Sequence, residues 1–463
     1  MILVTAIWKV RAFLNCWVRL INKEIILHKL FTLSLSRCLD NKNVSGNIMY
    51  QDLGNGLILR TGTKSDIKAI KDHVRKVHGK IVMPMIDRLF KLHPNFPVTD
   101  NFLIEDTKTG KIVAYFCLKR ADVVLSGLKL SIGQMEIVGT LEEYRNRGLI
   151  RKLNEAFERR VEEYKLPLLV IIGIPYYYRK LGYEYAIKMG GPLTVPLETV
   201  PALKKGETEP ITIEEVTKTT FPEYLHARAK HNSFLDFYRQ LSESEFLYLS
   251  YGKIEDEASY KFYLIRENQN VVGIFILAID WGAVEIHELL VKNIKDLVPV
   301  LRFFKGYAKR KRLPLRIYPP ARPAIIQSLE DLTRSKFIRP YAWYVRIPSI
   351  KRFVNTIKPV IEQRLAHSEF KQLTDSIRIS WYQEGIELVF KKGKLNTIKE
   401  IPRADVKDMH VSIPFPTIYQ LLLGYRSIDE LRQIYPDAGG TAIKLPIVRI
   451  LFPKIRALLT PGF

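Results

Sequence analysis

The sequence contains few cysteines, relatively few acidic residues and no long uncharged apolar run. Its 463 residues include only Cys16, Cys38 and Cys117, which are too far apart to build a disulfide framework or a zinc site. Lysine and arginine number 72 against 48 aspartates and glutamates, for a formal charge of +24. We therefore expect a protein of a reducing, cytoplasmic compartment that holds no metal.

The positive excess is spread along the chain. Residues 1–50 and 201–346 each carry +5, and residues 51–200 and 347–463 each carry +7. The densest basic run, residues 309–312, lies at the end of an expected helix, where cations suit the negative end of the helix dipole. We interpret the charge as a solvated surface and expect no nucleic-acid partner.

The first 50 residues form an apolar, basic extension. Six charged residues interrupt residues 1–35, so no uncharged stretch approaches the ~20 residues that span a bilayer: Lys9, Arg11, Arg19, Lys23, Glu24 and Lys29. One interpretation is a helix that lies on a membrane surface. The other is that upstream sequence has been joined to a true start at Met49. We favour the second, because the extension contains no cap, turn or cleavage signal.

Alternating strand and helix patterns over residues 51–200 predict an α/β domain. A strand at 57–60 precedes a helix to about residue 77, and strands at 101–104 and 112–117 flank a polar hairpin turn. The remaining elements follow in order along the chain: a strand at 134–138, a glycine turn at 145–148, a helix to about residue 164, a buried strand at 166–172 and a short helix with a turn glycine at 175–183.

The same order of elements recurs about 150 residues later, which indicates a duplication. Strands at 262–265 and 271–277 repeat the hairpin, and residues 284–286 match 135–137, so that Glu285 repeats Glu136. The second copy has no Arg-x-x-Gly turn between its strands, so we expect it to be degenerate. Residues from 347 onward predict helices around strands at 377–381 and 386–390, a third domain of α+β type.

The turn at residues 145–148 is the feature most suggestive of chemistry. A strand that leads into a glycine turn and a helix start presents several backbone N–H groups to one point, and the positive end of the helix dipole adds to their attraction for a phosphate. Arg145 and Gly148 supply such a turn. Alone, this pattern is weak, because a glycine before a helix is commonly only a turn.

With its neighbours, the turn resembles the GNAT N-acetyltransferase superfamily over residues 55–195. The resemblance rests on the hairpin, the Arg145–Gly148 turn and the Tyr178-Arg-Lys-Leu-Gly-Tyr183 segment. The degenerate second copy and residues 421–427 with 452–453 resemble the enhanced-intracellular-survival (Eis) type, which ends in a sterol-carrier-protein-like domain. This implies a catalytic GNAT domain at 51–200, a degenerate one at 201–346, a sterol-carrier-like domain at 347–463, and a homo-oligomer, as in the family's hexamers.

The resemblance also implies roles for individual residues. Tyr178 would be the general acid and the terminal carboxylate of Phe463 the general base, with Glu136 as a competing base through water. The cofactor-binding residues would contact the pantetheine and the pyrophosphate of acetyl-CoA: Val138, Thr140, Arg145, Asn146, Arg147, Gly148 and Leu149. A base is needed because a lysine-like amine, with a pKa near 10.4, is protonated at neutral pH and cannot attack a thioester.

We therefore expect an acetyl-CoA-dependent N-acetyltransferase that acts on a primary amine of a small cationic molecule or a protein lysine. The alternative is a non-catalytic CoA- or lipid-binding protein on the same scaffolds. Each site residue also has a purely structural interpretation: tyrosine packing around a strand end for Tyr178, an exposed strand position for Glu136, and a hydrophobic anchor for Phe463. We take His73, His78 and His93 as ordinary surface residues, since their spacing suits no metal.

Overall fold

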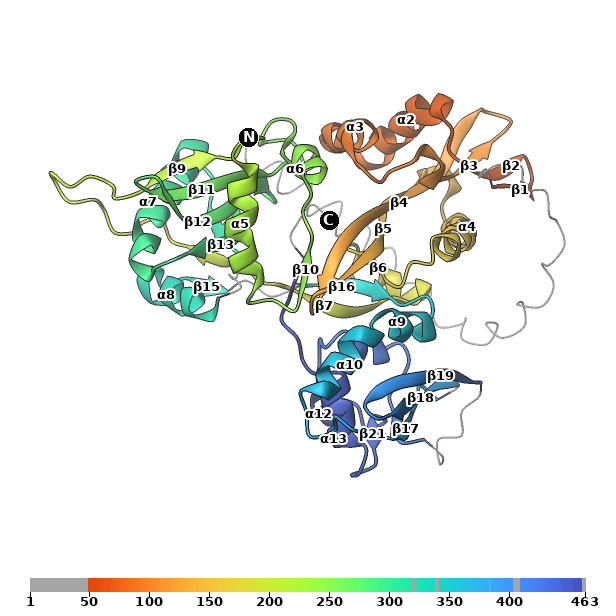
Figure 1. Ribbon diagram of the computed structural model, residues 1–463. Coiled ribbons are helices and arrows are strands. Elements are labelled where there is room, and N and C mark those ends of the chain that lie inside the picture. The colour runs from red at the N-terminus through yellow and green to blue at the C-terminus, as the bar shows by residue number, and fades with distance from the viewer. Residues whose placement is uncertain (1–48, 319–321, 338–340, 383, 403–408, 460–463) are drawn as a thin grey trace. The chain divides into compact units, whose positions relative to one another are not determined.

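The structure is a computed structural model and describes residues 49–318, 322–337, 341–382, 384–402 and 409–459 (Figure 1). Residues 1–48, and with them nearly all of the predicted extension, lie outside the described residues, as does Phe463. The described residues form three sheets with their helices. No helix among them is long and apolar enough to cross a membrane.

The first sheet has the strand order β1-β2-β3-β4-β5-β6-β16-β7, with β10 paired to β4 and β22 to β10. Its strands are β1 (Tyr50–Gly54), β2 (Leu57–Thr61), β3 (Asn101–Asp106), β4 (Lys111–Leu125), β5 (Leu128–Thr140), β6 (Leu169–Ile171), β7 (Glu184–Gly190), β10 (Phe237–Arg239), β16 (Tyr341–Arg346) and β22 (Ala457–Leu458). The predicted hairpin is confirmed as β3 and β4. The pair β5–β6 is parallel, which requires the crossover that the helix between them provides.

Helices cover both faces of this sheet, because side chains alternate along each strand. Helix α2 (Ile67–His78) belongs to the same buried cluster as Leu103, Tyr115 and Ile137, and α3 (Met83–Leu92) lies in that cluster too. Helix α4 (Leu149–Glu163) packs with the alternate set, which includes Phe102 and Phe116. The two sets of strand residues therefore form separate cores on opposite faces.

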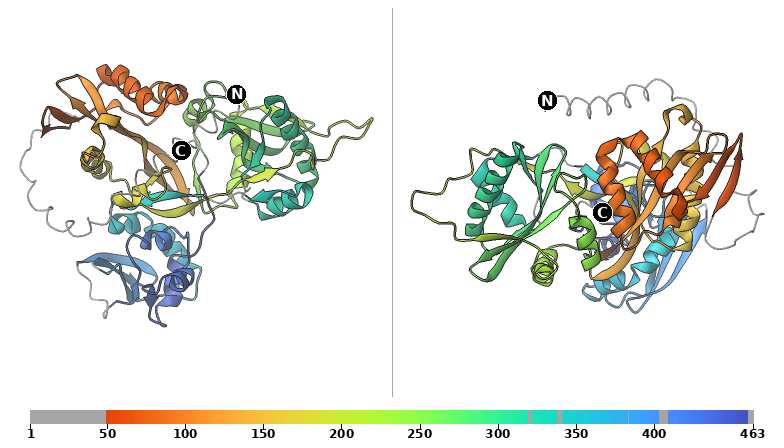
Figure 2. Two further views of the ribbon diagram at one scale, coloured as in Figure 1. Left: turned by 180° about the vertical axis from the view of Figure 1, so that it is seen from behind. Right: turned by 90° about the horizontal axis from the view of Figure 1, so that it is seen from above.

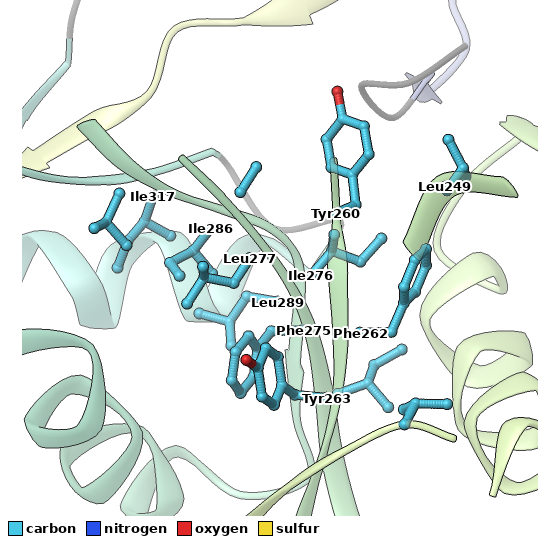
Figure 3. Close-up of a cluster of buried hydrophobic side chains, with 14 of the residues drawn as sticks. Leu249, Tyr260, Phe262, Tyr263, Phe275, Ile276, Leu277, Ile286, Leu289 and Ile317 are labelled. Carbon is cyan, nitrogen blue, oxygen red and sulfur yellow. The ribbon is translucent and has the colours of Figure 1, made fainter. Parts of the chain in front are cut away.

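The second sheet has the order β15-β8-β14-β13-β12-β11-β9. Its strands are β8 (Leu193–Val195), β9 (Thr212–Glu215), β11 (Lys261–Glu267), β12 (Asn270–Asp280), β13 (Ala283–Val291), β14 (Leu315–Ile317) and β15 (Lys336–Phe337), and its helices are α5 (Phe221–Asn232), α6 (Glu243–Ser250), α7 (Leu297–Lys311) and α8 (Pro323–Thr333). Helix α5 lies on one face of the sheet, with α7 and α8 on the other (Figures 1 and 2). Stacked Tyr263 and Phe275, 4.7 Å apart, lie in its core (Figure 3).

The first two sheets exchange strands. Strand β16 follows all of the second sheet's elements in sequence, yet it pairs antiparallel with β6 and β7 in the first sheet. Conversely, β8 follows β7 along the chain and pairs with β14 and β15 in the second sheet. Each sheet is therefore completed by a strand from the other part of the chain.

The third sheet has the order β19-β18-β17-β20-β21. Its strands are β17 (Asp375–Ser380), β18 (Glu384–Lys391), β19 (Lys394–Pro402), β20 (Val411–Ser412) and β21 (Gly439–Gly440), with helices α9 (Ile350–Thr356), α10 (Lys358–Ala366), α11 (Ile418–Leu422), α12 (Ile428–Ile434) and α13 (Leu445–Leu451). The predicted fold class is confirmed: two successive α/β units with similar element order, followed by an α+β domain.

Candidate active site

The two central parallel strands of the first sheet diverge. Among the described residues, strand β5 pairs with β6 only at Gly133–Leu169 and Gln134–Val170 and then continues to Thr140 with no strand on that side. Main-chain polar groups left out of a ladder need other partners. In the stretch from Glu136 to Thr140, the backbones of the buried Ile137 and Gly139 meet the rings of His78 and His73. The half-buried Val138 and Thr140, both predicted from the sequence, can therefore offer backbone hydrogen bonds to a ligand.

Strand β5 carries a bulge at the point where it leaves β6. Ile137 has a left-handed φ of 57°, and the register with β4 shifts between Tyr115 and Cys117. A bulge leaves one residue unpaired and redirects the neighbouring backbone, and bulges are common beside active sites. The sequence analysis did not predict this bulge, because a β-branched residue at positive φ has no local signal.

Two histidines of α2 lie beneath the bulge. His73 is only 4% exposed, and its Nδ1 lies 2.8 Å from the carbonyl oxygen of Ile112. Burial lowers the pKa of His73, and it lowers the pKa of His78 to about 4, with the charge of His73 adding to the effect. The prediction that these are surface residues is wrong for His73: it follows Ile70 by three positions and so shares the buried face of the helix.

The predicted phosphate-binding turn has the geometry of an anion site. Asn146 and Gly148 adopt left-handed φ values of 64° and 72°, with Arg147 between them, and alternation of this kind turns successive N–H groups towards one point. Helix α4 begins at Leu149, and no side chain caps it at Gly148. The first N–H groups of α4 are therefore available to an anion.

The side chains of the turn divide into two kinds. Arg145 and Arg147 are exposed; their guanidinium groups donate to the carbonyl oxygens of Thr140 (3.4 Å) and Glu143 (2.9 Å). Leu149 buries its side chain at 5% exposure, so that only its backbone can contact a ligand. The turn therefore combines free backbone donors with two cations that meet no carboxylate among the described residues.

The described residues of the second sheet contain no such turn. The segment before α7 is closed by Asn293 and Asp296, which cap each other's backbone, so that side chains of the chain itself occupy the N–H groups there. Strand β13 nevertheless has an equivalent bulge, with Glu288 at a φ of 51°. The residue before this bulge is His287, as Glu136 is before Ile137. The predicted match of Glu285 with Glu136 is therefore out of register with the bulge.

Tyr178 lies in a short 3₁₀ helix, Tyr177–Leu181, that follows β6. It is 5% exposed, and its ring packs against those of Tyr177, Tyr183 and Tyr344 at 5.2, 6.2 and 5.7 Å. Burial raises the pKa of Tyr178 well above its ordinary value, and the charge of Glu136 adds to this. The phenol therefore keeps its proton at neutral pH and can serve only as a donor or a hydrogen-bonding group.

Strand β16 supplies two tyrosines that hold this segment, and sequence analysis missed both. Tyr344 stacks on Tyr185 at 3.9 Å, and its hydroxyl accepts a 2.5 Å hydrogen bond from the backbone N–H of Tyr176. Tyr341 donates from its hydroxyl to the carbonyl oxygen of Gly173 at 2.6 Å. No local signal could have found them, because they come from a strand more than 150 residues further along the chain.

Glu136 is half-buried on the strand before the bulge and accepts a hydrogen bond from the amide of Gln134. Burial raises its pKa, and Lys119 partly opposes this. Lys119, which faces Gln134 across the β4–β5 ladder, is itself 6% exposed, and burial lowers its pKa to about 8. The structure therefore brings together a carboxylate and an ammonium group that sequence analysis had not paired.

The predicted terminal base cannot be placed, because Phe463 lies outside the described residues. The last described strand, β22, runs parallel to β10, which in turn pairs with β4. The described part of the chain contains no cluster of histidine, cysteine and acidic side chains that could hold a metal.

Comparison with known proteins identifies the first sheet. Residues 59–186 match the acetyltransferase (GNAT) domain family. No curated protein matches the sequence. Similar solved structures include a probable N-acyltransferase of unknown function from Enterococcus faecalis V583, with 15% identity and a TM-score of 0.63 over 90% of this chain and 100% of that one.

Two further structures show the same likeness. A GCN5-related N-acetyltransferase from Anabaena variabilis ATCC 29413 has 14% identity and a TM-score of 0.62, over 88% of this chain and 100% of that one. Eis1 from Mycobacterium abscessus has 10% identity and a TM-score of 0.55, over 90% of this chain and 99% of that one. At these identities the likeness establishes the fold. Residues 59–186 therefore match the acetyltransferase (GNAT) domain family, whose domains use acetyl-CoA as the acyl donor.

Proposed function

We propose that the protein transfers an acetyl group from acetyl-CoA to the primary amine of a small cationic molecule or a protein lysine. The observation that carries this proposal is the uncapped, left-handed turn before α4, directly after a strand that diverges from its neighbour. Free N–H groups at a helix start suit a pyrophosphate, and an unpaired strand suits the amides of pantetheine. The residues present therefore fit the donor.

Acetyl-CoA supplies an activated thioester, and the protein orients it. Arg145, Asn146, Arg147, Gly148 and the backbone of Leu149 would hold the pyrophosphate. The backbone around Val138 and Thr140 would align the pantetheine arm along β5. In this alignment a backbone N–H of β5 near Val138 would stabilise the negative charge that develops on the acetyl oxygen during attack.

Tyr178 would donate the proton that the departing thiolate needs. A phenol is protonated at neutral pH, and the ring of Tyr178 packs against those of Tyr177, Tyr183 and Tyr344, which hold it in place. Because the proton donor is already held in place, the reaction does not lose the entropy that positioning a mobile donor would cost. Tyr341 and Tyr344 would act as positioning residues, because they hold the backbone of Gly173 and Tyr176 on either side of the segment that leads to Tyr178.

Two groups compete for the role of general base. Glu136 would act through water; its raised pKa makes it a better proton acceptor than an exposed carboxylate. The terminal carboxylate of Phe463 is the other candidate. Glu136→Gln and deletion of Phe463 separate them: the variant that lowers kcat while acetyl-CoA binding persists identifies the base.

The surroundings of Glu136 do not decide the choice of amine. Lys119 is buried beside it, and the charge of Glu136 partly offsets the effect of burial on the pKa of Lys119. Arg239, the next cation, is paired with Glu245 at 3.1 Å. These paired charges favour neither class of acceptor, so kcat/KM in a panel of polyamines, aminoglycosides and lysine peptides identifies it.

The test of the function is thiol release from acetyl-CoA in the presence of this panel. We expect Tyr178→Phe to lower kcat by about 100-fold with little change in acetyl-CoA binding, since general acid catalysis contributes roughly 10²–10⁴-fold. Tyr183→Phe is the matched control, because it removes a buried hydroxyl that has no hydrogen-bond partner in the part of the chain that the structure describes. Binding of acetyl-CoA without turnover of any amine would support a non-catalytic CoA- or lipid-binding protein instead.

We also propose that residues 347–463 form a sterol-carrier-protein-like domain and that the protein is a homo-oligomer of hexameric type. The α+β composition of the third sheet and its helices supports the first proposal. Sedimentation tests the second, and a monomer at working concentration would contradict it.

A further inference from the structure

The second α/β unit contains a cavity that the proposed acetyl transfer does not use. It has a volume of about 590 Å³ and lies between α5 and the strands β12 and β13. Helix α5 crosses this face of the sheet in Figure 1. The lining is mainly apolar and includes Ala227, Phe234, Val271, Val272, Leu290 and Val291. The cavity is therefore large enough for a small molecule and suited to an alkyl chain.

A small side chain on α5 contributes to the cavity at a position where the first unit has a histidine. Helices α2 and α5 both have twelve residues and pack on corresponding strands. The seventh residue of α2 is His73, whose ring fills the space beside Ile112, but the seventh residue of α5 is Ala227. An alanine leaves empty the volume that an imidazole takes.

Close packing of the strands fixes the floor of the cavity. A Cβ added to Gly273 would lie 2.3 Å from the carbonyl oxygen of Leu290 and 2.8 Å from Cδ1 of Ile265. Glycine therefore lets β12 approach β13 beside the bulge. Because backbone rather than a flexible side chain is the nearest group, the floor cannot rearrange easily to close the space.

The rim of the cavity is positively charged. Lys230 and Lys292 are exposed there, and Arg322 donates from Nη1 to the carbonyl oxygen of Lys292 at 3.2 Å. None of the three forms an ion pair with a carboxylate in the part of the chain that the structure describes. The acidic residue on the rim, Glu223, shares Arg266 with Glu214, at 2.9 and 2.5 Å. The rim therefore presents three cations against one carboxylate, an excess of positive charge that attracts an anion.

We propose that this cavity binds a fatty acid, with the alkyl chain between α5 and the strands and the carboxylate among Lys230, Lys292 and Arg322. An apolar interior favours burial of the methylene groups of an alkyl chain. A cationic rim selects a carboxylate over a neutral or cationic head group of the same chain length. The site is separate from the turn before α4, so the test of fatty-acid binding does not depend on whether the protein transfers acetyl groups.

The experiment is calorimetric titration of the full chain with dodecanoate, dodecanol and dodecyltrimethylammonium, each below its micelle concentration. We expect dodecanoate to bind most tightly. Lys230→Glu with Lys292→Glu should weaken it by at least about tenfold, because two attractive charges become repulsive. A control pair with the same charge change, Lys205→Glu with Lys309→Glu, lies at exposed positions away from the cavity and should leave binding unchanged.

A second variant tests the interior. Ala227→Trp fills the cavity and should abolish dodecanoate binding, whereas the rim pair keeps the proposal testable if the tryptophan variant does not fold. Three results would overturn the proposal: no binding of dodecanoate to the unaltered protein, equal binding of dodecanol, or dodecanoate binding that survives the rim substitutions. The last result would place the lipid elsewhere, with the third domain as the next region to test.

Discussion

Substitution of Gly173 by alanine tests whether the position of Tyr178 matters for turnover. A Cβ at this position would lie 2.2 Å from Cε2 of Tyr178 and 2.9 Å from its hydroxyl oxygen. Favourable contacts between such atoms are ≈ 3.5–4.0 Å. The ring would therefore have to withdraw by more than about 1 Å, or the backbone would have to move by a similar amount.

The surroundings of the ring decide how this displacement is taken up. Tyr177 and Tyr344 already pack against Tyr178, and the carbonyl of Gly173 is held by Tyr341. The phenol therefore cannot retreat without disturbing an aromatic cluster, and overpacking of this kind costs about 1–3 kcal/mol of stability. A displacement of ~1 Å in an active site can cost on the order of 100-fold in rate.

We expect Gly173→Ala to lower kcat for thiol release by about 100-fold, with a much smaller change in the KM for acetyl-CoA. The KM is spared because Gly173 lies outside the turn at residues 145–149. Gly439→Ala is the matched control, since a Cβ there meets nothing within 4 Å. If the folded Gly173 variant kept kcat within about threefold of the unaltered protein, the role of Tyr178 as proton donor would be refuted.

Three further predictions concern the turn, the buried histidines and the second sheet. Gly148→Ala should raise the KM for acetyl-CoA about fivefold with little change in kcat, because a backbone φ of 72° costs alanine roughly 1–2 kcal/mol. An unchanged KM would argue against the turn as the phosphate site. Burial holds the pKa of His78 at about 4 against 6.5 when unfolded, so His78 by itself should contribute a loss of about 3 kcal/mol in stability as the pH drops from 6.5 to 4. His73 and other buried histidines contribute to the same fall. Urea midpoints across this range should therefore show a fall smaller by about 3 kcal/mol in His78→Leu, and an equal fall would contradict this. Glu288→Gln should destabilise the second sheet by about 3–5 kcal/mol, since it breaks a buried bidentate pair with Arg228 at 2.6 and 2.7 Å; thermal melts that match the unaltered protein would contradict this.

The sequence by itself determined the elements that depend on local pattern. Alternating apolar residues on either side of a polar turn predicted the β3–β4 hairpin, and helical spacing predicted α2 and α4 to within a few residues. Gly148 predicted the turn before α4, because a residue with free φ is needed where a strand enters a helix without a cap. The closed helix start at Asn293 agrees with the expected loss of this turn from the second copy.

Only the tertiary structure decided which strands meet and what they enclose. Strand β16 completes the first sheet, and its tyrosines hold the segment before Tyr178, yet its own residues would pair as well with any strand that presents a free edge. The bulges at Ile137 and Glu288 depend on the register between strands, which no single strand encodes. The cavity beside Ala227 follows from the same cause, because an absent side chain becomes empty volume only when its neighbours are held in place by packing elsewhere.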